Sequence, residues 1–408
     1  MSALLSLEEA QERLLALALA LAPQPQPQVT MLGLSQATTK GYLAQDIVAL
    51  RSQPAADLSA MDGYAISGPG PWRKVGESRA GAPFSGTLAS GECVRISTGA
   101  VVPEGACSIL IQENAMVDGD TIATAPGEQP PPAGRHIRRA GFDFRKGDIV
   151  LHKGTPLTPA TMALAISAGH KALPIVARPS VAVLDCGDEL VPVGDPAAVH
   201  QIPASNGVML SWMLAPYIGE VDAILGPVAD DPAALSMALR RAENCDILVT
   251  SGGASVGEHD LIRQALGDWG ATIDFWKVAL KPGKPLMVAT RPRENGRVQI
   301  ILGLPGNPVS SFVTAYLFAL PLVRAALGAA DPLPRAVTMK AGEALPATQK
   351  RREFLRGVCD GTSVRLAGSQ DSSALGTLAA ADCLIDRLPD SPALAAGEPV
   401  RVFLLREG

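Results

Sequence analysis

Residues 246–260 read Asp-Ile-Leu-Val-Thr-Ser-Gly-Gly-Ala-Ser-Val-Gly-Glu-His-Asp, and this stretch decides the fold class of the chain. Its apolar part, residues 247–249, is typical of a strand that is buried on both faces of a parallel sheet. Ser251, Gly252 and Gly253 interrupt the run, and apolar residues follow at helical spacing from Leu261. A strand, a glycine turn and a helix form the geometry that holds an anion against backbone N–H groups.

Two carboxylates, Glu258 and Asp260, follow this turn. A pocket that offers both amide groups and carboxylates suits a phosphate that arrives with a divalent metal ion such as Mg²⁺. Acidic residues in a first helical turn also complement the helix dipole without binding anything. The stretch by itself leaves both interpretations open.

Length and composition narrow the class of protein. A chain of 408 residues is too long for one core and predicts several domains. Its 47% hydrophobic and 18% charged residues are typical of a folded chain. The net charge of −5 gives no global basic field, so we expect neither a nucleic acid nor an anionic membrane as partner.

The cysteines and the apolar runs predict a cytoplasmic protein. The six cysteines are scattered without a Cys-x-x-Cys pair, which argues against a zinc knuckle or a disulfide framework and for a reducing compartment. The apolar run at 14–22 is too short to cross a bilayer, and the run at 311–330 is interrupted by Pro321 and Arg324.

The pattern along the chain predicts a multidomain α/β protein. From residue 178 strands alternate with helices, which predicts a doubly wound, mostly parallel sheet over 178–330, with one strand at 273–280. Gly- and Pro-rich sequence with short β-like runs predicts an inserted β-rich domain at 46–146. Residues 331–408, with short alternating runs, predict a C-terminal β-barrel-like domain. Residues 1–45 and 147–177 remain as a split N-terminal domain, whose first helix we expect to pack on the α/β domain.

Turns that carry charged and polar residues follow the strands of the α/β region. Glu189 lies in an acidic Gly turn after the strand at 181–184, and Lys281-Pro282-Gly283-Lys284-Pro285 follows the strand that ends near 280. Strand alternation predicts that Lys277 and Lys281 point to one side. After residue 304 comes Pro305-Gly306-Asn307-Pro308-Val309-Ser310, where Asn307 can cap a helix that begins at Pro308.

Because ligands of such sheets bind at the carboxyl ends of the strands, these turns predict one crevice. Lysines for oxyanions and carboxylates for a divalent metal describe a phosphoanhydride or oxyanion site. The Rossmann and P-loop glycine motifs are absent after these strands, and the five histidines are too dispersed for structural zinc.

The β-rich insertion contributes further polar turns. Asp62 precedes Gly63 and reads as a turn former, and Thr98 places a hydroxyl at a glycine turn. Arg138 belongs to a run of three arginines, 135–139, that precedes Asp143. Such a run is either a solvated face or a site for a phosphorylated ligand.

Six motifs in register carry a family resemblance. They are Ser-Ala-Met-Asp-Gly-Tyr-Ala (59–65), Ser-Thr-Gly-Ala (97–100), Gly-Asp-Glu-Leu (187–190), Ser-Gly-Gly-x-Ser-Val-Gly-Glu-x-Asp (251–260), Lys-Pro-Gly-Lys-Pro (281–285) and Pro-Gly-Asn-Pro-Val-Ser (305–310). Together they closely resemble the MoeA-type molybdopterin molybdenumtransferase family, also seen as the E domain of gephyrin. The resemblance runs from the first helix to the C-terminal β domain.

The resemblance implies a molybdenum insertase, which places molybdate into adenylyl-molybdopterin, cleaves the pyrophosphate with Mg²⁺ and releases AMP. It implies a homodimer in which Asp62 and Thr98 act across the two subunits. The positions that match the family's molybdate site are Lys281, Lys284, Pro285, Ser310, Arg356 and Ser373. The implied catalytic residues are Asp62, Thr98, Asp143, Glu189, Asp260, Lys277 and Lys281. The further substrate-binding candidates are Ser251, Gly252, Gly253, Ser255, Pro305, Gly306, Asn307 and Arg138, and the metal candidates are Glu189, Glu258 and Asp260.

The chain departs from the family pattern at Ala204, Phe142, Cys186 and Ala254, and the Ala204 change puts one ligand contact in doubt. Two alternatives to the insertase are a molybdopterin adenylyltransferase and a non-catalytic molybdopterin-binding scaffold. The inserted and C-terminal β domains argue against the first, and the absence of a long disordered linker argues against the second. The adenylyltransferase and molybdoenzyme maturation proteins are candidate partners.

Overall fold

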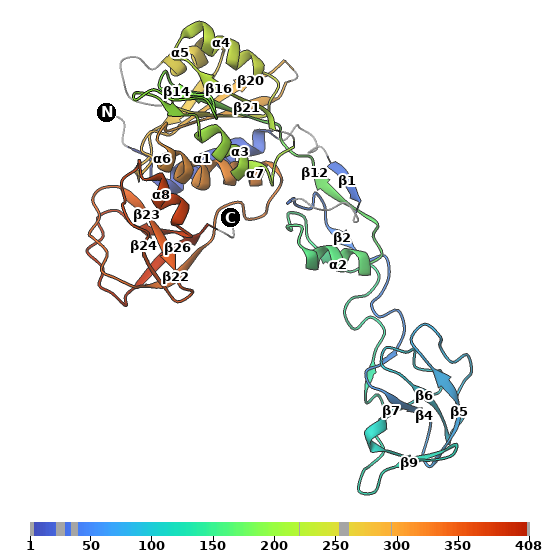
Figure 1. Cartoon of the computed structure of the whole chain (residues 1–408). Helices are drawn as coiled ribbons and strands as arrows, with labels where there is room; N and C mark the ends of the chain where they lie inside the picture. Colours follow the sequence, from blue (N-terminus) through green and yellow to red (C-terminus); the bar gives the residue numbers. More distant parts are fainter. Residues whose placement is uncertain are drawn as a thin grey trace.

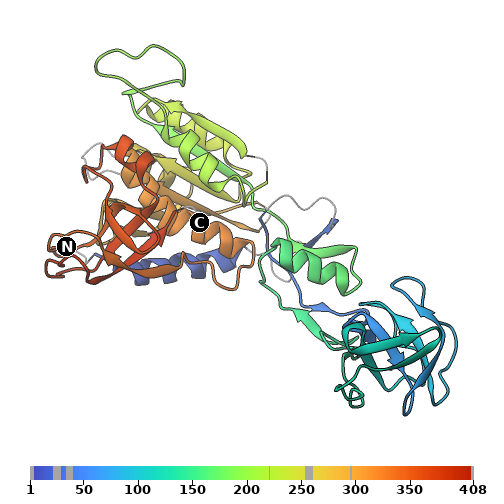
Figure 2. The same cartoon turned by 60° about the horizontal axis from the view of Figure 1, so that its bottom comes forward.

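The computed structural model describes residues 4–21, 29–33, 40–219, 221–252, 261–294 and 296–405. The chain is elongated, with a helix-flanked sheet and a C-terminal β domain at one end and a β-rich lobe at the other (Figure 1). A small connecting lobe separates the two ends, and the turned view in Figure 2 shows the same separation.

The α/β region is built on a six-stranded sheet of order β16-β13-β17-β21-β20-β18. β13 lies parallel to β16 and β17, and β17 is parallel to β21, whereas β20 runs antiparallel to both of its neighbours. The strands are β13 (Val181–Cys186), β16 (Val221–Val228), β17 (Ile247–Ser251), β18 (Thr272–Trp276), β20 (Met287–Pro292) and β21 (Val298–Leu304). The predicted mostly parallel sheet is therefore confirmed.

Helices cover both faces of this sheet, as expected of a doubly wound fold. Alternate strand residues divide between two cores: Val183 and Val249 pack on one face, and Leu184 and Leu248 on the other. The first core also holds α1 (Leu7–Leu21), α3 (Asn206–Leu214), α6 (Pro308–Thr314) and α7 (Leu320–Ala326), and the second holds α4 (Pro232–Arg241) and α5 (Leu261–Asp268). A π-helical segment, Ala315–Ala319, joins α6 to α7.

The continuous helix from α6 to α7 lies in the core. Among the described residues, Pro308–Ala326 is the one helix long and apolar enough to cross a membrane, and 83% of that window is buried inside the fold. Arg324 within it is also buried and donates a hydrogen bond to the hydroxyl of Tyr217 at 3.0 Å. Burial in a sheet-packed core therefore accounts for the apolar sequence.

The predicted single strand at 273–280 is wrong. β18 ends at Trp276, Lys277 has a φ of 75°, and β19 (Leu280–Lys281) pairs with a strand of the C-terminal domain instead. A positive φ at a residue other than glycine ends the extended conformation. The alternation that was expected to align Lys277 with Lys281 therefore does not apply. Strand β20 was not predicted, and it fills the sheet between β21 and β18.

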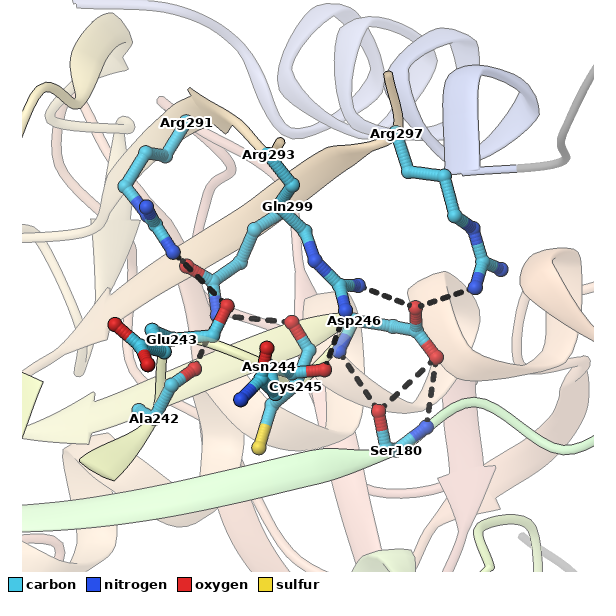
Figure 3. A network of polar contacts seen from close by, with 10 residues as sticks. All are labelled: Ser180, Ala242, Glu243, Asn244, Cys245, Asp246, Arg291, Arg293, Arg297 and Gln299. Atoms are coloured by element: carbon cyan, nitrogen blue, oxygen red, sulfur yellow. Dashed lines mark hydrogen bonds and ion pairs between the residues drawn. The ribbon is translucent and has the colours of Figure 1, made fainter. Parts of the chain in front are cut away.

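A polar network fixes the amino end of β17, opposite the strand-end turns (Figure 3). Asp246 accepts a hydrogen bond from Arg293 Nη1 at 2.8 Å and forms an ion pair with Arg297 at 3.4 Å. Its other carboxylate oxygen accepts the Ser180 N–H at 3.0 Å. Gln299 donates to the carbonyls of Ala242 and Cys245. The network joins β13, β17 and the β20–β21 hairpin, so Asp246 has a structural role.

The connecting lobe combines two distant segments of the chain. β1 (Val29–Gly33) pairs with β12 (Ala172–Val176), and β2 (Ile47–Val48) pairs with β11 (Ile149–Leu151). Leu43, Leu151 and Leu173 form its core with α2 (Pro159–Ser167), which begins with a capping box at Thr158 and Thr161.

The β-rich lobe carries a six-stranded sheet of order β7-β4-β6-β5-β9-β8. Its strands are β4 (Gly63–Ile66), β5 (Trp72–Ser78), β6 (Glu92–Ile96), β7 (Ser108–Ile111), β8 (Ala115–Asp118) and β9 (Thr121–Thr124). A short pair, β3 (Leu58–Ser59) with β10 (Ile137–Arg138), closes the lobe where the chain enters and leaves it.

The C-terminal domain is a closed five-stranded barrel, which confirms the barrel-like prediction. The ring runs β23-β24-β22-β26-β25 and closes where β25 pairs with β23. The strands are β22 (Ala336–Ala341), β23 (Arg352–Cys359), β24 (Ser363–Leu366), β25 (Cys383–Arg387) and β26 (Pro399–Leu404). A short helix that was not expected, α8 (Leu375–Ala380), lies between β24 and β25 and contacts α6.

Candidate functional site

Three turns at the carboxyl ends of the parallel strands meet at the first turn of α3. Asn206, at the start of α3, donates from Nδ2 to Ser251 Oγ at 2.8 Å and to the carbonyl of Gly306 at 2.7 Å. The next residue, Gly207, donates its N–H to Asp185 Oδ2 at 2.6 Å. The turns after β13, β17 and β21 are thus joined through the first turn of one helix.

Glycine is required where these turns touch. Gly252 has a φ of 89°, and a Cβ added there would lie 2.2 Å from the carbonyl oxygen of Cys186. A Cβ on Gly306 would lie 3.3 Å from the Gly252 Cα. Only glycine combines that φ with so close a backbone approach. The predicted binding residues Ser251, Gly252 and Gly306 are therefore brought together, whereas Gly253, Ser255, Glu258 and Asp260 lie outside the described residues.

Two polar residues of this crevice, Asp185 and Asn206, were not among the predicted site residues. Both are buried, and Asp185 Oδ1 and Asn206 Oδ1 have no hydrogen-bond partner among the described residues. Burial raises the pKa of Asp185, and the Gly207 N–H and the Ser251 hydroxyl oppose that rise. Both side chains line a small pocket with Glu189, Ser251 and Gly306. Unpaired buried oxygens mark the place where a ligand or water would bind.

Carboxylates gather beside this pocket. Glu189 follows β13, and Asp230 follows β16, the neighbouring strand. The Asp230 N–H donates to Asp188 Oδ1 at 2.9 Å. Partial burial raises the pKa of Asp230, and the nearby charges of Asp188 and Glu189 raise it further. The cluster therefore has excess negative charge.

The turn after β21 leads into α6 as the sequence predicted. Asn307 caps the helix by accepting the Ser310 N–H at 3.4 Å, and Pro308 is the first helical residue. Ser310 is buried, with 7% of its surface exposed. Pro305 and Gly306 form the link between β21 and this cap. Free N–H groups of a helix start thus lie next to the crevice.

The loop that carries the lysines lies between α6 and the barrel. A Cβ on Gly283 would lie 2.5 Å from Thr314 Cγ2 of α6, so the loop packs directly on that helix. At its start, Lys281 Nζ forms an ion pair with Glu353 of β23 at 3.2 Å. Lys277 precedes the loop, and its N–H donates to the carbonyl of Leu286, just after the loop, at 2.9 Å. Lys284 is exposed and Pro285 is half-buried.

Arg356 of β23 organises the loop that contains Ser373. Its guanidinium is buried and donates from Nη2 to the carbonyls of Ser369 and Asp371, at 3.0 and 2.9 Å. Burial lowers the pKa of Arg356. Asp371 in turn accepts both the N–H and the hydroxyl of Ser373, and these bonds lower the pKa of the Asp371 carboxyl. The Nε of Arg356 has no partner among the described residues.

The remaining predicted residues lie in the β-rich lobe. Asp62 Oδ1 accepts the N–H of Thr98 at 2.8 Å, so the structure brings these two together. Arg138 and Asp143 are both exposed, and Asp143 donates its N–H to the carbonyl of Gln53. Within one chain the whole lobe lies far from the strand-end turns (Figure 1). Arg139, the last of the three arginines that precede Asp143 in the sequence, forms an ion pair with Asp57 at 2.5 Å.

The departures from the family pattern occupy different environments. Ala204 is buried and lines the pocket beside Asn206, and Cys186 is buried at the end of β13. Phe142, in contrast, has 78% of its surface exposed next to Asp143. Ala254 lies outside the described residues.

Family models match three consecutive parts of the chain. Residues 5–169 match the MoeA N-terminal region (domain I and II), residues 182–325 match a probable molybdopterin binding domain, and residues 338–405 match the MoeA C-terminal region (domain IV). The molybdopterin molybdenumtransferase of Haemophilus influenzae is 35% identical over 88% of this chain and 90% of its own length. Molybdopterin molybdenumtransferase 2 of Mycobacterium tuberculosis is 36% identical over 88% and 91%.

Solved structures agree with the sequence matches. A molybdopterin biosynthesis moeA protein from Pyrococcus horikoshii superposes with a TM-score of 0.82 at 25% identity, covering 98% of this chain and all of that one. A molybdenum cofactor biosynthesis protein from Pyrococcus furiosus, at 19% identity and a TM-score of 0.60, shares the fold. The protein is therefore a transferase of molybdenum cofactor biosynthesis. The chain belongs to the molybdopterin molybdenumtransferase (MoeA) family.

Proposed function

We propose that this chain is a molybdenum insertase. It takes adenylyl-molybdopterin and molybdate, cleaves the pyrophosphate in the presence of Mg²⁺, and releases molybdenum-loaded molybdopterin and AMP. The observation that carries the proposal is the joining of three strand-end turns by Asn206 and Gly207, together with a lysine loop that packs on α6 and pairs with β23. We propose that the amide donors bind phosphate and that the lysines of this loop face the same crevice to bind an oxyanion.

Each part of the crevice has a proposed task. Backbone N–H groups at the start of α6 hold phosphate oxygens, and Ser251 and Asn206 keep the neighbouring strand-end turns in place. Lys281 and Lys284 neutralise molybdate, and Lys277 neutralises the pyrophosphate.

The barrel contributes the far side of the molybdate site. Arg356 positions the loop of Ser373, and its Nε–H, which has no partner among the described residues, is a donor for an oxyanion. Ser310 and Pro285 complete this site from the α/β side. Arg356 and Ser310 are buried, which strengthens their hydrogen bonds because little water competes for the groups.

The residues present fit Mg²⁺. Glu189 lies near Asp188 and Asp230. Partial burial and then the charges of Asp188 and Glu189 raise the pKa of Asp230. Carboxylate oxygens are the ligands that Mg²⁺ prefers. We assign the metal to Glu189 together with Glu258 and Asp260. Bound Mg²⁺ would neutralise charge on the pyrophosphate oxygens. These carboxylate side chains also orient the substrate, and the Glu189 carboxylate lies at the edge of the pocket.

We propose that the active unit is a homodimer. Asp62, Thr98, Arg138 and Asp143 lie on a lobe that is remote from the strand-end turns of the same chain, so a second copy must supply them if they act at this site (Figure 1). The contact of Asp62 with Thr98 supports a common role for this pair. The protein would work in the cytoplasm with small-molecule substrates, with the adenylyltransferase and maturation proteins as partners.

The test is an incubation of the purified protein with adenylyl-molybdopterin, molybdate and Mg²⁺. The insertase releases AMP only when molybdate is present. An adenylyltransferase instead consumes ATP and molybdopterin to make the adenylylated compound, and a scaffold binds the pterin without releasing AMP. Either of these two results contradicts the proposal.

A further inference from the structure

We propose that the C-terminal barrel contains a zinc-type metal site formed by Cys359, Asp382 and Cys383. The ligating atoms of these three residues all lie within 4.8 Å of one another, and no other group of this kind was found among the described residues. The site lies in the barrel, at the β23–β25 pair, and does not depend on the proposed function.

The strand register explains why the two thiols meet. Gly357 of β23 pairs directly with Cys383 of β25, and a Cβ on Gly357 would lie 2.9 Å from the Cys383 Sγ. Cys359 is two residues further along β23, so its side chain lies on the same face as Gly357. The thiols therefore form a diagonal cross-strand pair.

Two hydrogen bonds to β23, one from the backbone and one to the side chain, hold Asp382 near the thiols. Its N–H donates to the carbonyl of Gly357 at 3.0 Å, and its Oδ1 accepts the N–H of Cys359 at 2.9 Å. One carboxylate oxygen is thus used in positioning, and the other remains for a ligand. Cys359 and Asp382 are half-buried, whereas Cys383 is fully buried.

The donor set selects the ion. Two sulfurs and one carboxylate oxygen suit a borderline-soft divalent cation, with water in the open fourth position, whereas Mg²⁺ prefers oxygen alone. A tetrahedral zinc site with bonds of about 2.3 Å places its sulfurs roughly 3.8 Å apart. The two sulfurs, which lie at most 4.8 Å apart, must therefore approach each other by about 1 Å or less.

A reactive cysteine is a poorer explanation of the same group. Burial and the Asp382 carboxylate raise the pKa of both Cys359 and Cys383. Nucleophilic thiols need the opposite shift. Metal binding would replace the two thiol protons, which pass to the buffer, by two metal–sulfur bonds.

The metal site would stabilise the end of β23, the strand that also carries Arg356. β23 also carries Arg356, three residues before Cys359, and Arg356 holds the loop of Ser373. A metal bridge between β23 and β25 would tie the end of this strand to its neighbour.

The experiment is a titration of the reduced, chelator-treated full-length chain with Cd²⁺, followed by Zn²⁺. We expect one Cd²⁺ per chain, with the near-ultraviolet absorption of two thiolates, and its displacement by Zn²⁺. Cys359→Ser should weaken binding at least about tenfold and remove half of the absorption. The matched control is Cys107→Ser, which removes an exposed thiol in the β-rich lobe and should change nothing.

Asp382→Asn provides a second variant that keeps both thiols, and it should weaken Cd²⁺ binding while retaining the two-thiolate absorption. Circular dichroism of each metal-free variant verifies that the barrel is folded. The proposal is overturned if the wild-type chain shows no thiolate absorption, or if Cys359→Ser binds Cd²⁺ as tightly as the wild type.

Discussion

The substitution Asn206→Ala tests the joining of the strand-end turns. It removes the hydrogen bonds to Ser251 Oγ and to the carbonyl of Gly306, both of which are made by one buried amide. A buried hydrogen bond contributes about 0.5–1.5 kcal/mol net, so the two together stabilise the turns by about 1–3 kcal/mol. Loss of the unpaired Oδ1 offsets part of this cost, which keeps the expected value within that range.

The direct readout is hydrogen exchange at the Gly252 amide, which donates to the carbonyl of Leu304. A loss of about 1–3 kcal/mol makes local opening about 5- to 150-fold more frequent, and exchange should accelerate by that factor. AMP release should fall as well, because the phosphate-holding amides lose their fixed positions.

The matched control is Asn114→Ala in the β-rich lobe, where the amide bonds only to the exposed Glu128. It should change stability by less than about 0.5 kcal/mol. The reasoning is refuted if Asn206→Ala leaves Gly252 exchange and the melting midpoint at wild-type values, or if the control variant has an equal effect.

Three further predictions concern other parts of the chain. Lys281→Ala should abolish most molybdate-dependent AMP release yet cost only about 1 kcal/mol of stability, because the Lys281 side chain is half-exposed in its pair with Glu353. The exposed control Lys340→Ala should retain activity, and equal rates for the two variants would contradict the assignment. Asp246→Ala should cost about 3 kcal/mol in chemical denaturation, because the buried Arg293 loses its carboxylate partner. Activity at low temperature should persist, because the network lies opposite the crevice; an inactive but fully stable variant would be inconsistent with this. Burial raises the folded-state pKa of Asp185, so its charge destabilises the fold above that pKa. Asp185→Asn should therefore be more stable than the wild type near pH 7–8 and lose that advantage as the pH falls. A pH-independent difference in melting midpoint would disprove this prediction.

The fold could be predicted because its signals are local and periodic. Continuous apolar runs identified β13, β17 and β21, and the rule for ligands of parallel sheets placed their terminal turns together. The cap at Asn307 was also predictable, because Asn followed by Pro is a helix-start pattern.

The missing details depend on long-range contacts. Asn206 reads in sequence as another helix-start residue, and only the fold shows that its amide joins two other turns. The break at Lys277 carries no glycine signal, since a lysine adopts the positive φ. Cys359 and Cys383 are too far apart in sequence for a metal motif, and the β23–β25 register brings them together.

The measurement that tests the central claim most directly is AMP release by mixed dimers of Asp62→Asn and Lys281→Ala chains. If Asp62 of one copy completes the lysine site of the other, half of the randomly formed dimers are mixed, and each has one intact site of two. The mixture should then recover about one quarter of wild-type activity, although each variant alone is inactive. Mixed dimers, verified by differential tagging, that remain as inactive as their parents would contradict a site shared between two copies.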